Sequence, residues 1–151
     1  MKSYVANPIH EGSASRVQSA IVFFDGVCGL CNKTVDFLLR EDRDGRLLYS
    51  PLQGETFEPI RKERPELASV DAIVVLFGDD SGQHVLTSSD AVLFALDQIP
   101  RFKWLVKAGY LVPRFLRELG YRFVAAVRYR VWGKRDSCRL PTPEERARFL
   151  P

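Results

Sequence analysis

Apolar residues in the first hundred positions fall into short runs separated by polar, turn-forming segments. Three runs are rich in β-branched and aromatic residues, which favours buried strands over 21–24, 47–49 and 72–77. A shorter strand is expected over 83–86, after the turn-rich segment 78–82. This spacing predicts a β-hairpin between the last two strands.

The segment 28–41 carries its apolar residues on one face, which predicts an amphipathic helix. We also expect a polar helix over 56–64, which ends before Pro65, and a helix over 90–99. Ser88 or Ser89 is placed to cap the last of these, with Asp90 in its first turn. The order β-α-β-α-β-β-α joins a parallel strand-helix-strand unit to an antiparallel hairpin, and it predicts a thioredoxin-like α/β fold.

After Pro100 the pattern becomes helical throughout. Helices are predicted over 102–112 and 114–132, because Pro113 between them removes a helical hydrogen-bond donor. The second helix carries an apolar stripe at helical spacing, formed by Leu116, Leu119, Phe123, Val127 and Val131. We predict that this stripe docks on the thioredoxin-like body.

Length and composition fit one globular domain, with 151 residues, 46% hydrophobic and 27% charged. We divide it into a flexible N-terminal leader over 1–19, a thioredoxin-like core over 20–100 and a helical basic C-terminal extension over 101–151 that packs on the core. The leader lacks the apolar region of a secretory signal, and no apolar run reaches the roughly 18 to 20 residues that cross a bilayer. These features predict a soluble, cytoplasmic protein.

The two parts of the chain differ in charge. Residues 1–100 hold 9 basic and 15 acidic residues, whereas residues 101–151 hold 13 basic and 4 acidic ones. Such polarity is typical of a chain that binds an anionic partner or membrane surface, or of basic helices that dock on an acidic body. The second interpretation is favoured here. We expect no nucleic-acid partner, and membrane-surface contact is the disfavoured alternative.

The strongest chemical signal is the motif Cys28-Gly29-Leu30-Cys31, which begins where the first strand gives way to a helix. In a reducing compartment a close cysteine pair is more often catalytic or metal-binding than structural. This spacing places one sulfur at the helix start and the other one turn further in. The unpaired amides and the dipole of the helix are expected to lower the pKa of Cys28 and to ionise it at least partly near neutral pH.

We therefore predict a thiol-disulfide oxidoreductase with Cys28 as nucleophile and Cys31 as resolver. Cys28 attacks a substrate disulfide, and Cys31 then attacks the mixed disulfide and releases the reduced product. Asp25 either accepts backbone N–H bonds in its own turn or relays the proton of Cys31 as a catalytic modulator, and both alternatives stay open. The expected partners are a disulfide or dithiol substrate, protein or small molecule, and an unidentified reductant or oxidant. No bound cofactor is required.

Other interpretations of these residues are disfavoured. A zinc site needs two further ligands, and the chain offers only Cys138, His10 and His84 at distant positions. Two reduced cysteines that only pack in the core are a second alternative. The strand-end Asp25 also resembles that of haloacid-dehalogenase-like phosphatases, but Val27 stands where that family carries a second acid.

The octet at 25–32, Asp-Gly-Val-Cys-Gly-Leu-Cys-Asn, resembles the D-x-x-C-x-x-C pattern of the DCC family of predicted thiol-disulfide oxidoreductases. Further similarities lie within 38–45, 88–92 and 113–133, so the resemblance spans about residues 21–139. It implies a thioredoxin-like fold and disulfide exchange through Asp25, Cys28 and Cys31. Asp90 matches a later acidic position of the family, but an ordinary first-turn acid is the favoured explanation and we do not count this residue as catalytic.

The sequence departs from thioredoxins at one place. Thioredoxins carry a cis-proline immediately before the third strand, beside the CxxC pair, where its backbone helps to bind substrate chains. Here Ser69-Val70-Asp71 precede the strand. If Val70 takes the proline's place, a small disulfide or a specialised partner is favoured over a peptide-like substrate.

Cys138 and the basic tail leave two further alternatives. Cys138 follows the basic loop 133–137 and would be an additional thiol of the site if the tail folds back over Cys28, but a free cysteine is favoured. The alternative to an enzyme is a non-catalytic thioredoxin-fold binding module that uses the basic helical tail to hold an anionic protein or membrane surface.

Overall fold

A computed structural model describes residues 19–70, 73–79 and 82–151, so the predicted leader lies outside the described residues except for Ser19. One four-stranded sheet contains β1 (Ala20–Phe24), β2 (Leu47–Pro51), β3 (Val74–Asp79) and β4 (Gly82–Thr87). Its order is β2-β1-β3-β4, with β1 parallel to β2 and β3 antiparallel to both neighbours. The predicted α/β fold of the thioredoxin type and its terminal hairpin are confirmed.

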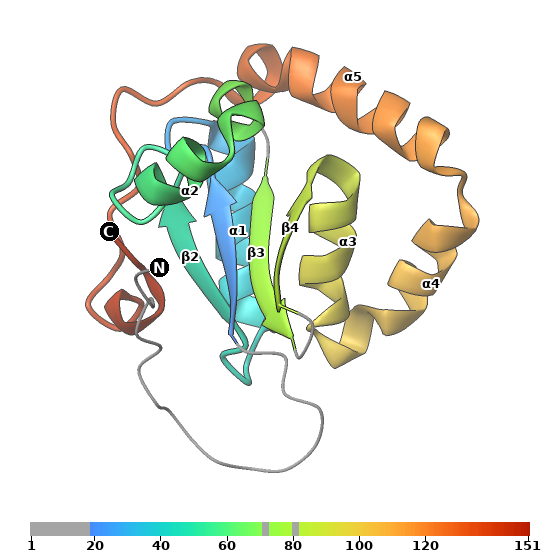
Figure 1. Cartoon of the computed structure of the whole chain (residues 1–151), viewed down its shortest axis with the longest axis horizontal. Helices are drawn as coiled ribbons and strands as arrows, with labels where there is room; N and C mark the ends of the chain where they lie inside the picture. The colour runs from blue at the N-terminus through green and yellow to red at the C-terminus, as the bar shows by residue number, and fades with distance from the viewer. Residues whose placement is uncertain (1–18, 71–72, 80–81) are drawn as a thin grey trace.

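The sheet is the middle of three layers (Figure 1). On one face lie α1 (Gly29–Glu41) and α3 (Ser88–Asp97), and on the other lie α2 (Glu58–Glu63) and the 3₁₀ turn η1 (Pro65–Ser69). Side chains alternate along β1 as strand geometry requires, so that Val22 and Phe24 meet the first pair of helices. Phe23 meets the second layer, where its ring lies 4.9 Å from that of Phe57.

After α3 the chain forms the 3₁₀ turn η2 (Pro100–Phe102), α4 (Lys103–Leu111) and α5 (Arg114–Trp132), with Pro113 at the break as predicted. Figure 1 shows α4 and α5 arching around the outer side of α3. α5 packs against both α1 and α3. No helix among the described residues is long and apolar enough to cross a membrane.

The predicted docking of the apolar stripe of α5 is wrong. Leu119 is 65% exposed and Phe123 is 68% exposed, and Leu116 and Val131 also face outward. The face that meets the body is polar instead and holds Arg117, Glu118, Tyr121 and Arg128. Their partners in the body are the carboxylates of Asp90 and Asp25, the Ser89 hydroxyl and the Ile73 N–H, so polar contacts help to fasten α5.

The predicted serine cap of α3 is also wrong. Thr87 occupies the N-cap position without a side-chain bond, and the helix begins at Ser88, whose φ of 57° lies in the left-handed region. The Ser89 hydroxyl donates to Glu118 of α5 and is therefore not available to cap its own helix. Asp90 does lie in the first turn, where Arg117 binds it at 2.9 Å and Arg114 at 3.2 Å.

The chain beyond α5 holds one 3₁₀ turn, η3 (Arg146–Arg148), and no α-helix, so the predicted helical extension ends at Trp132. This segment returns to the sheet beside β2, where the Leu150 amide donates to the Tyr49 carbonyl at 2.8 Å. Arg148 binds the buried Asp42. Together with the ion pairs of α5, this contact agrees with the interpretation that the basic part of the chain docks on an acidic body.

Candidate active site

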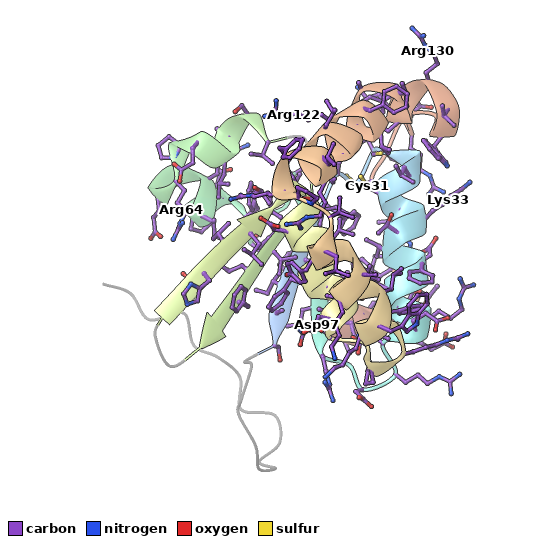
Figure 2. The ribbon with its side chains drawn as sticks, turned by 90° about the vertical axis from the view of Figure 1, so that its right-hand side faces the viewer. Cys31, Lys33, Arg64, Asp97, Arg122 and Arg130 are labelled. Atoms are coloured by element: carbon purple, nitrogen blue, oxygen red, sulfur yellow. The ribbon has the colours of Figure 1, made fainter. Side chains whose placement is uncertain are left out.

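The CxxC pair lies where β1 passes into α1, as the sequence predicts. Three residues, 25–27, follow Phe24, and Cys28 then takes the N-cap position of α1 in an extended conformation. The sulfur of Cys28 accepts the Cys31 N–H at 3.4 Å, so it replaces the side-chain oxygen that usually satisfies this orphan amide. Figure 2 shows Cys31 at the end of α1 that lies below α5.

Neither thiol reaches the surface. Cys28 is 0% exposed and Cys31 is 4% exposed, although a sulfur at a helix start is expected to be accessible. Both cysteines are free thiols within one apolar cluster that also contains Val35 and Phe24. Contact with a substrate disulfide therefore requires a local movement of whatever covers Cys28.

The segment 133–138, which we name the strap, pairs with the backbone on either side of Cys28. The Gly29 amide donates to the Gly133 carbonyl at 3.2 Å, and the Arg135 amide donates to the Val27 carbonyl at 2.7 Å. Cys28 and Lys134 form an antiparallel bridge between these two bonds. A Cβ atom at Gly29 would overlap the Trp132 carbonyl oxygen, so a glycine is required for this close approach.

Cys138 ends the strap beside the turn that precedes Cys28. Its sulfur lies 3.9 Å from the Gln53 side-chain oxygen and 2.6 Å from where a Cβ atom at Gly26 would stand. The tail therefore folds back over the CxxC turn, which is the condition stated above for a third thiol at the site. The chemical role of Cys138 stays a prediction.

Asp25 is buried at the end of β1 and is surrounded by donors. Its Oδ1 accepts the Val27 N–H at 3.1 Å, which is the turn bond anticipated from the sequence, and the Gln53 amide at 3.0 Å. Its Oδ2 accepts the Tyr129 hydroxyl and lies 3.7 Å from the Arg128 guanidinium. These contacts fix the carboxylate in place and supply it with a buried counter-charge.

Arg128 is the main addition that the structure makes to the predicted site. It is 4% exposed, its Nη2 donates to the Tyr129 hydroxyl at 3.0 Å, and its guanidinium lies over the ring of that tyrosine. Burial disfavours the charged form, but the bond to Tyr129 and the nearby sulfurs of Cys31 and Cys28 outweigh burial and raise the pKa of Arg128. A permanent positive charge therefore faces both the carboxylate and the two thiols.

Burial raises the pKa of the Cys31 thiol to about 12, and the hydrogen bond and charge of Cys28 act in the same direction. Arg128 opposes this shift without cancelling it. Burial and the bond to Asp25 likewise raise the pKa of Tyr129 to about 12. Cys31 and Tyr129 thus stay protonated near neutral pH, which suits Cys31 to act second in an exchange.

Asn32 holds the turn that carries Cys28. This fully buried side chain donates from its Nδ2 to the Gly26 carbonyl at 2.9 Å and to the Cys28 carbonyl at 2.7 Å. It thereby satisfies two carbonyl groups that the turn leaves inside the protein, where unpaired polar groups are costly. Asn32 is a positioning residue for the CxxC turn.

Val70, which was considered as the residue in place of the thioredoxin cis-proline, does not directly precede the third strand. β3 begins at Val74, so the residue directly before it is Ile73, and Val70 is the C-cap of η1 instead. No described peptide bond is cis. The Ile73 N–H donates to the Tyr121 hydroxyl at 3.1 Å, so a side chain of α5 occupies a backbone group at the edge of the site.

The described residues offer no set of ligands for the zinc site that was disfavoured above. No group of three His, Cys, Asp or Glu side chains that could hold a metal exists in the described part of the chain. His84 lies on β4 and stacks on Phe77 with ring centroids 5.1 Å apart, and His10 lies outside the described residues.

Sequence reasoning placed Asp25, Cys28 and Cys31 correctly beside one another but assigned no function to four residues that contact them or their turn. These are Asn32, Gln53, Arg128 and Tyr129. A buried amide directly after the second cysteine was a usable signal for Asn32. Arg128 and Tyr129 offered only their place in the carboxy-terminal part of the family resemblance.

Comparison with known proteins agrees with the motif. The family model described as DCC1-like thiol-disulfide oxidoreductase matches residues 22–134. The uncharacterized protein YuxK of Bacillus subtilis is 33% identical over 141 residues, covering 92% of this chain and 99% of the relative. A chloroplastic DCC family protein of Arabidopsis thaliana is 33% identical over 121 residues, covering 80% of this chain and 69% of that protein. No solved structure matches the chain significantly. The chain therefore belongs to the DCC1-like thiol-disulfide oxidoreductase family.

Proposed function

We propose that the protein exchanges disulfides through Cys28 and Cys31. The observation that carries this proposal is the position of both cysteines at the start of α1, where the Cys31 N–H donates to the Cys28 sulfur. The amides and dipole of a helix start favour negative charge on a sulfur in that position. The Arg128 guanidinium adds a fixed positive charge nearby.

The exchange takes two steps. The Cys28 thiolate attacks one sulfur of a substrate disulfide, forms a mixed disulfide and expels the other substrate sulfur as a thiolate. Cys31 then loses its proton and attacks the Cys28 sulfur, which closes the Cys28–Cys31 disulfide and expels the second substrate thiolate. Two electrons pass from the dithiol to the substrate disulfide. An external thiol reductant then reduces the Cys28–Cys31 disulfide and restores the dithiol. The reverse sequence oxidises a dithiol.

Asp25 is proposed as the modulator of the second step. The Cys31 proton must leave before this thiol attacks, and burial keeps the pKa of Cys31 at about 12. A buried carboxylate held by Gln53 and Tyr129 is placed to accept that proton through an intervening water. Arg128 acts through Asp25, because its charge holds the carboxylate in a fixed position beside the turn.

A small disulfide is the substrate class that the surroundings favour. In thioredoxins the backbone before the third strand helps to bind extended chains, whereas here the Ile73 N–H is already bound by Tyr121. The strap also lies across the CxxC turn, where its backbone pairs with that of Cys28. A compact disulfide needs less of this cover to open than an extended peptide does.

The alternative function is a non-catalytic binding module, and the burial of both thiols is the observation that favours it. In that case the cysteines react only when the whole protein unfolds. Local opening of the strap would instead expose Cys28 at denaturant concentrations that leave the fold intact. The two functions therefore differ in a measurable way.

The test combines alkylation with trapping. In native protein without denaturant, Cys28 should react with iodoacetamide far faster than global unfolding allows, and Cys28→Ser should abolish this reaction. With oxidised glutathione, Cys31→Ser should accumulate a mixed disulfide on Cys28, detected by mass spectrometry, whereas the wild type should form the internal disulfide. Cys138→Ser serves as the control that keeps both cysteines. Reaction only at the rate of global unfolding would reject the enzyme in favour of the binding module.

A further inference from the structure

The outward side of α4 and α5 carries large apolar side chains that nothing in the described part of the chain covers. Leu111 is 85% exposed and Trp104 is 69% exposed. We name the following set the α4–α5 face: Trp104, Leu111, Val112, Phe115, Leu119 and Phe123. Soluble monomers rarely expose large apolar patches unless these patches bind something.

The residues of the α4–α5 face are arranged by helix geometry. At 100° per residue, Phe115, Leu119 and Phe123 span about 80° of α5. Arg117, Tyr121 and Arg128, which meet the body, lie on the opposite side. α5 is therefore an amphipathic helix whose polar side is buried and whose apolar side is exposed. Figure 1 shows the junction of α4 and α5 bowing outward from the body.

The same outward side is basic. Residues 103–132 contain seven basic residues and one acidic residue, and five of the basic ones remain once Arg117 and Arg128, which face the body, are set aside. That acid, Glu118, is bound to Ser89 and does not neutralise the outer surface. Arg122 and Arg130 fall in the same sector of α5 as Phe115 and Leu119, and both are exposed. Figure 2 views the molecule from this side and shows Arg130 projecting from α5.

We infer that the α4–α5 face binds the surface of an anionic lipid bilayer. An amphipathic helix with aromatic and leucine side chains between arginines is suited to lie in the interface, with its apolar side among the acyl chains and its cations at the headgroups. Trp104 is placed on this face, where indole rings favour the membrane interface. The helices lie on the bilayer and do not cross it.

A second copy of the chain fits this face less well. Self-association through one patch brings identical surfaces together, so Arg122 and Arg130 of each copy would meet like charges. An anionic bilayer meets both properties of the face at once, because it offers phosphates at its surface and an apolar layer below. It also deforms to fit the convex junction of the two helices.

The test is cosedimentation of the full chain with vesicles made of equal parts phosphatidylglycerol and phosphatidylcholine, compared with phosphatidylcholine alone. We expect at least about tenfold stronger binding to the anionic vesicles, since each basic residue near such a surface strengthens binding about fivefold. Phe115→Ser with Leu119→Ser should weaken binding about tenfold or more. Arg122→Glu with Arg130→Glu should do the same, and added salt should weaken wild-type binding.

The matched control is Arg43→Glu with Arg64→Glu, which changes net charge equally at exposed sites outside α4 and α5. It should bind within about twofold of wild type if the face is the contact, and an equal loss in this control would overturn the proposal. The proposal also fails if folded wild type ignores anionic vesicles. It fails equally if sedimentation without lipid shows a dimer that Leu119→Ser dissociates, or if polyglutamate binds in preference to vesicles. The thiol assays above do not depend on any of these outcomes.

Discussion

The guanidinium of Arg128 lies 3.7 Å from the carboxylate of Asp25, and neither side chain is more than 5% exposed. This buried contact joins α5 to the turn that carries the CxxC pair. The bond from Tyr129 to the same carboxylate lies beside it. The C-terminal helix therefore completes the surroundings of the two thiols, and the thioredoxin-like part alone would lack the positive charge at its site.

Arg128→Gln should lower the free energy of unfolding by about 3 kcal/mol, because it leaves the Asp25 carboxylate buried without its counter-charge. Urea unfolding measures this loss. Arg122→Gln is the control, since Arg122 is exposed on the same helix and its replacement should change stability by no more than about 0.5 kcal/mol.

A double-mutant cycle separates the charge contact from general packing. If Arg128 acts through Asp25, then Arg128→Gln combined with Asp25→Asn should lose clearly less stability than the sum of the single changes. Additive losses would show that the two side chains do not interact energetically. Arg128 would then be only a packing residue of α5.

The strand-helix-strand start, the hairpin and the two C-terminal helices were predictable because each depends on local patterns. Runs such as 21–24 and the break at Pro113 report the nearest neighbours of a residue along the chain. The same reasoning failed for the contact side of α5. Periodicity identifies an apolar side of a helix, but it does not state whether that side meets the protein or the solvent.

The site shows the same division. Asp25, Cys28 and Cys31 are close in sequence, so one turn brings them together. Arg128 and the strap reach the site only through tertiary packing, and no spacing rule connects them with Cys28. The sequence spacing therefore did not reveal that Cys28 is buried, or that a segment more than one hundred positions away pairs with its turn.

Cys31 should make stability fall at alkaline pH. Burial raises its pKa from 9.0 to about 12 in the folded protein, so the unfolded chain loses this proton at a pH where the folded protein keeps it. The contribution of the neutral thiol is complete below about pH 9 and is lost as the pH rises toward 12. Thermal unfolding of wild type and Cys31→Ala between pH 7 and about pH 10.5 measures the effect. The difference between them should shrink as the pH rises, and a constant difference would contradict the raised pKa.

Gly29→Ala should loosen the strap. The added methyl group would overlap the Trp132 carbonyl, so the bond from residue 29 to Gly133 should break. A loss of about 1 to 2 kcal/mol in local stability raises the exposed population about 5 to 30-fold, and native-state alkylation of Cys28 should accelerate by that factor. Gly120→Ala is the control, because no atom lies within 4 Å of its added methyl group. Unchanged alkylation in Gly29→Ala would mean that the strap does not control access.

Arg148→Gln should release the C-terminal segment from β2. Arg148 donates to the Leu47 carbonyl at 3.0 Å and binds Asp42, whose side chain is 1% exposed. Losing this charge partner should cost about 2 kcal/mol in urea unfolding, because Asp42 keeps only its backbone donors at Arg46 and Leu47. Amide exchange at Leu150, which donates to Tyr49, should become faster by the factor that corresponds to a similar loss of free energy, if the segment opens locally.

The exposed Arg146 in the same turn provides the control Arg146→Gln, which should leave both measurements unchanged. Loss of stability without faster exchange at Leu150 would place the effect of Arg148 in the core and not in the attachment of the tail.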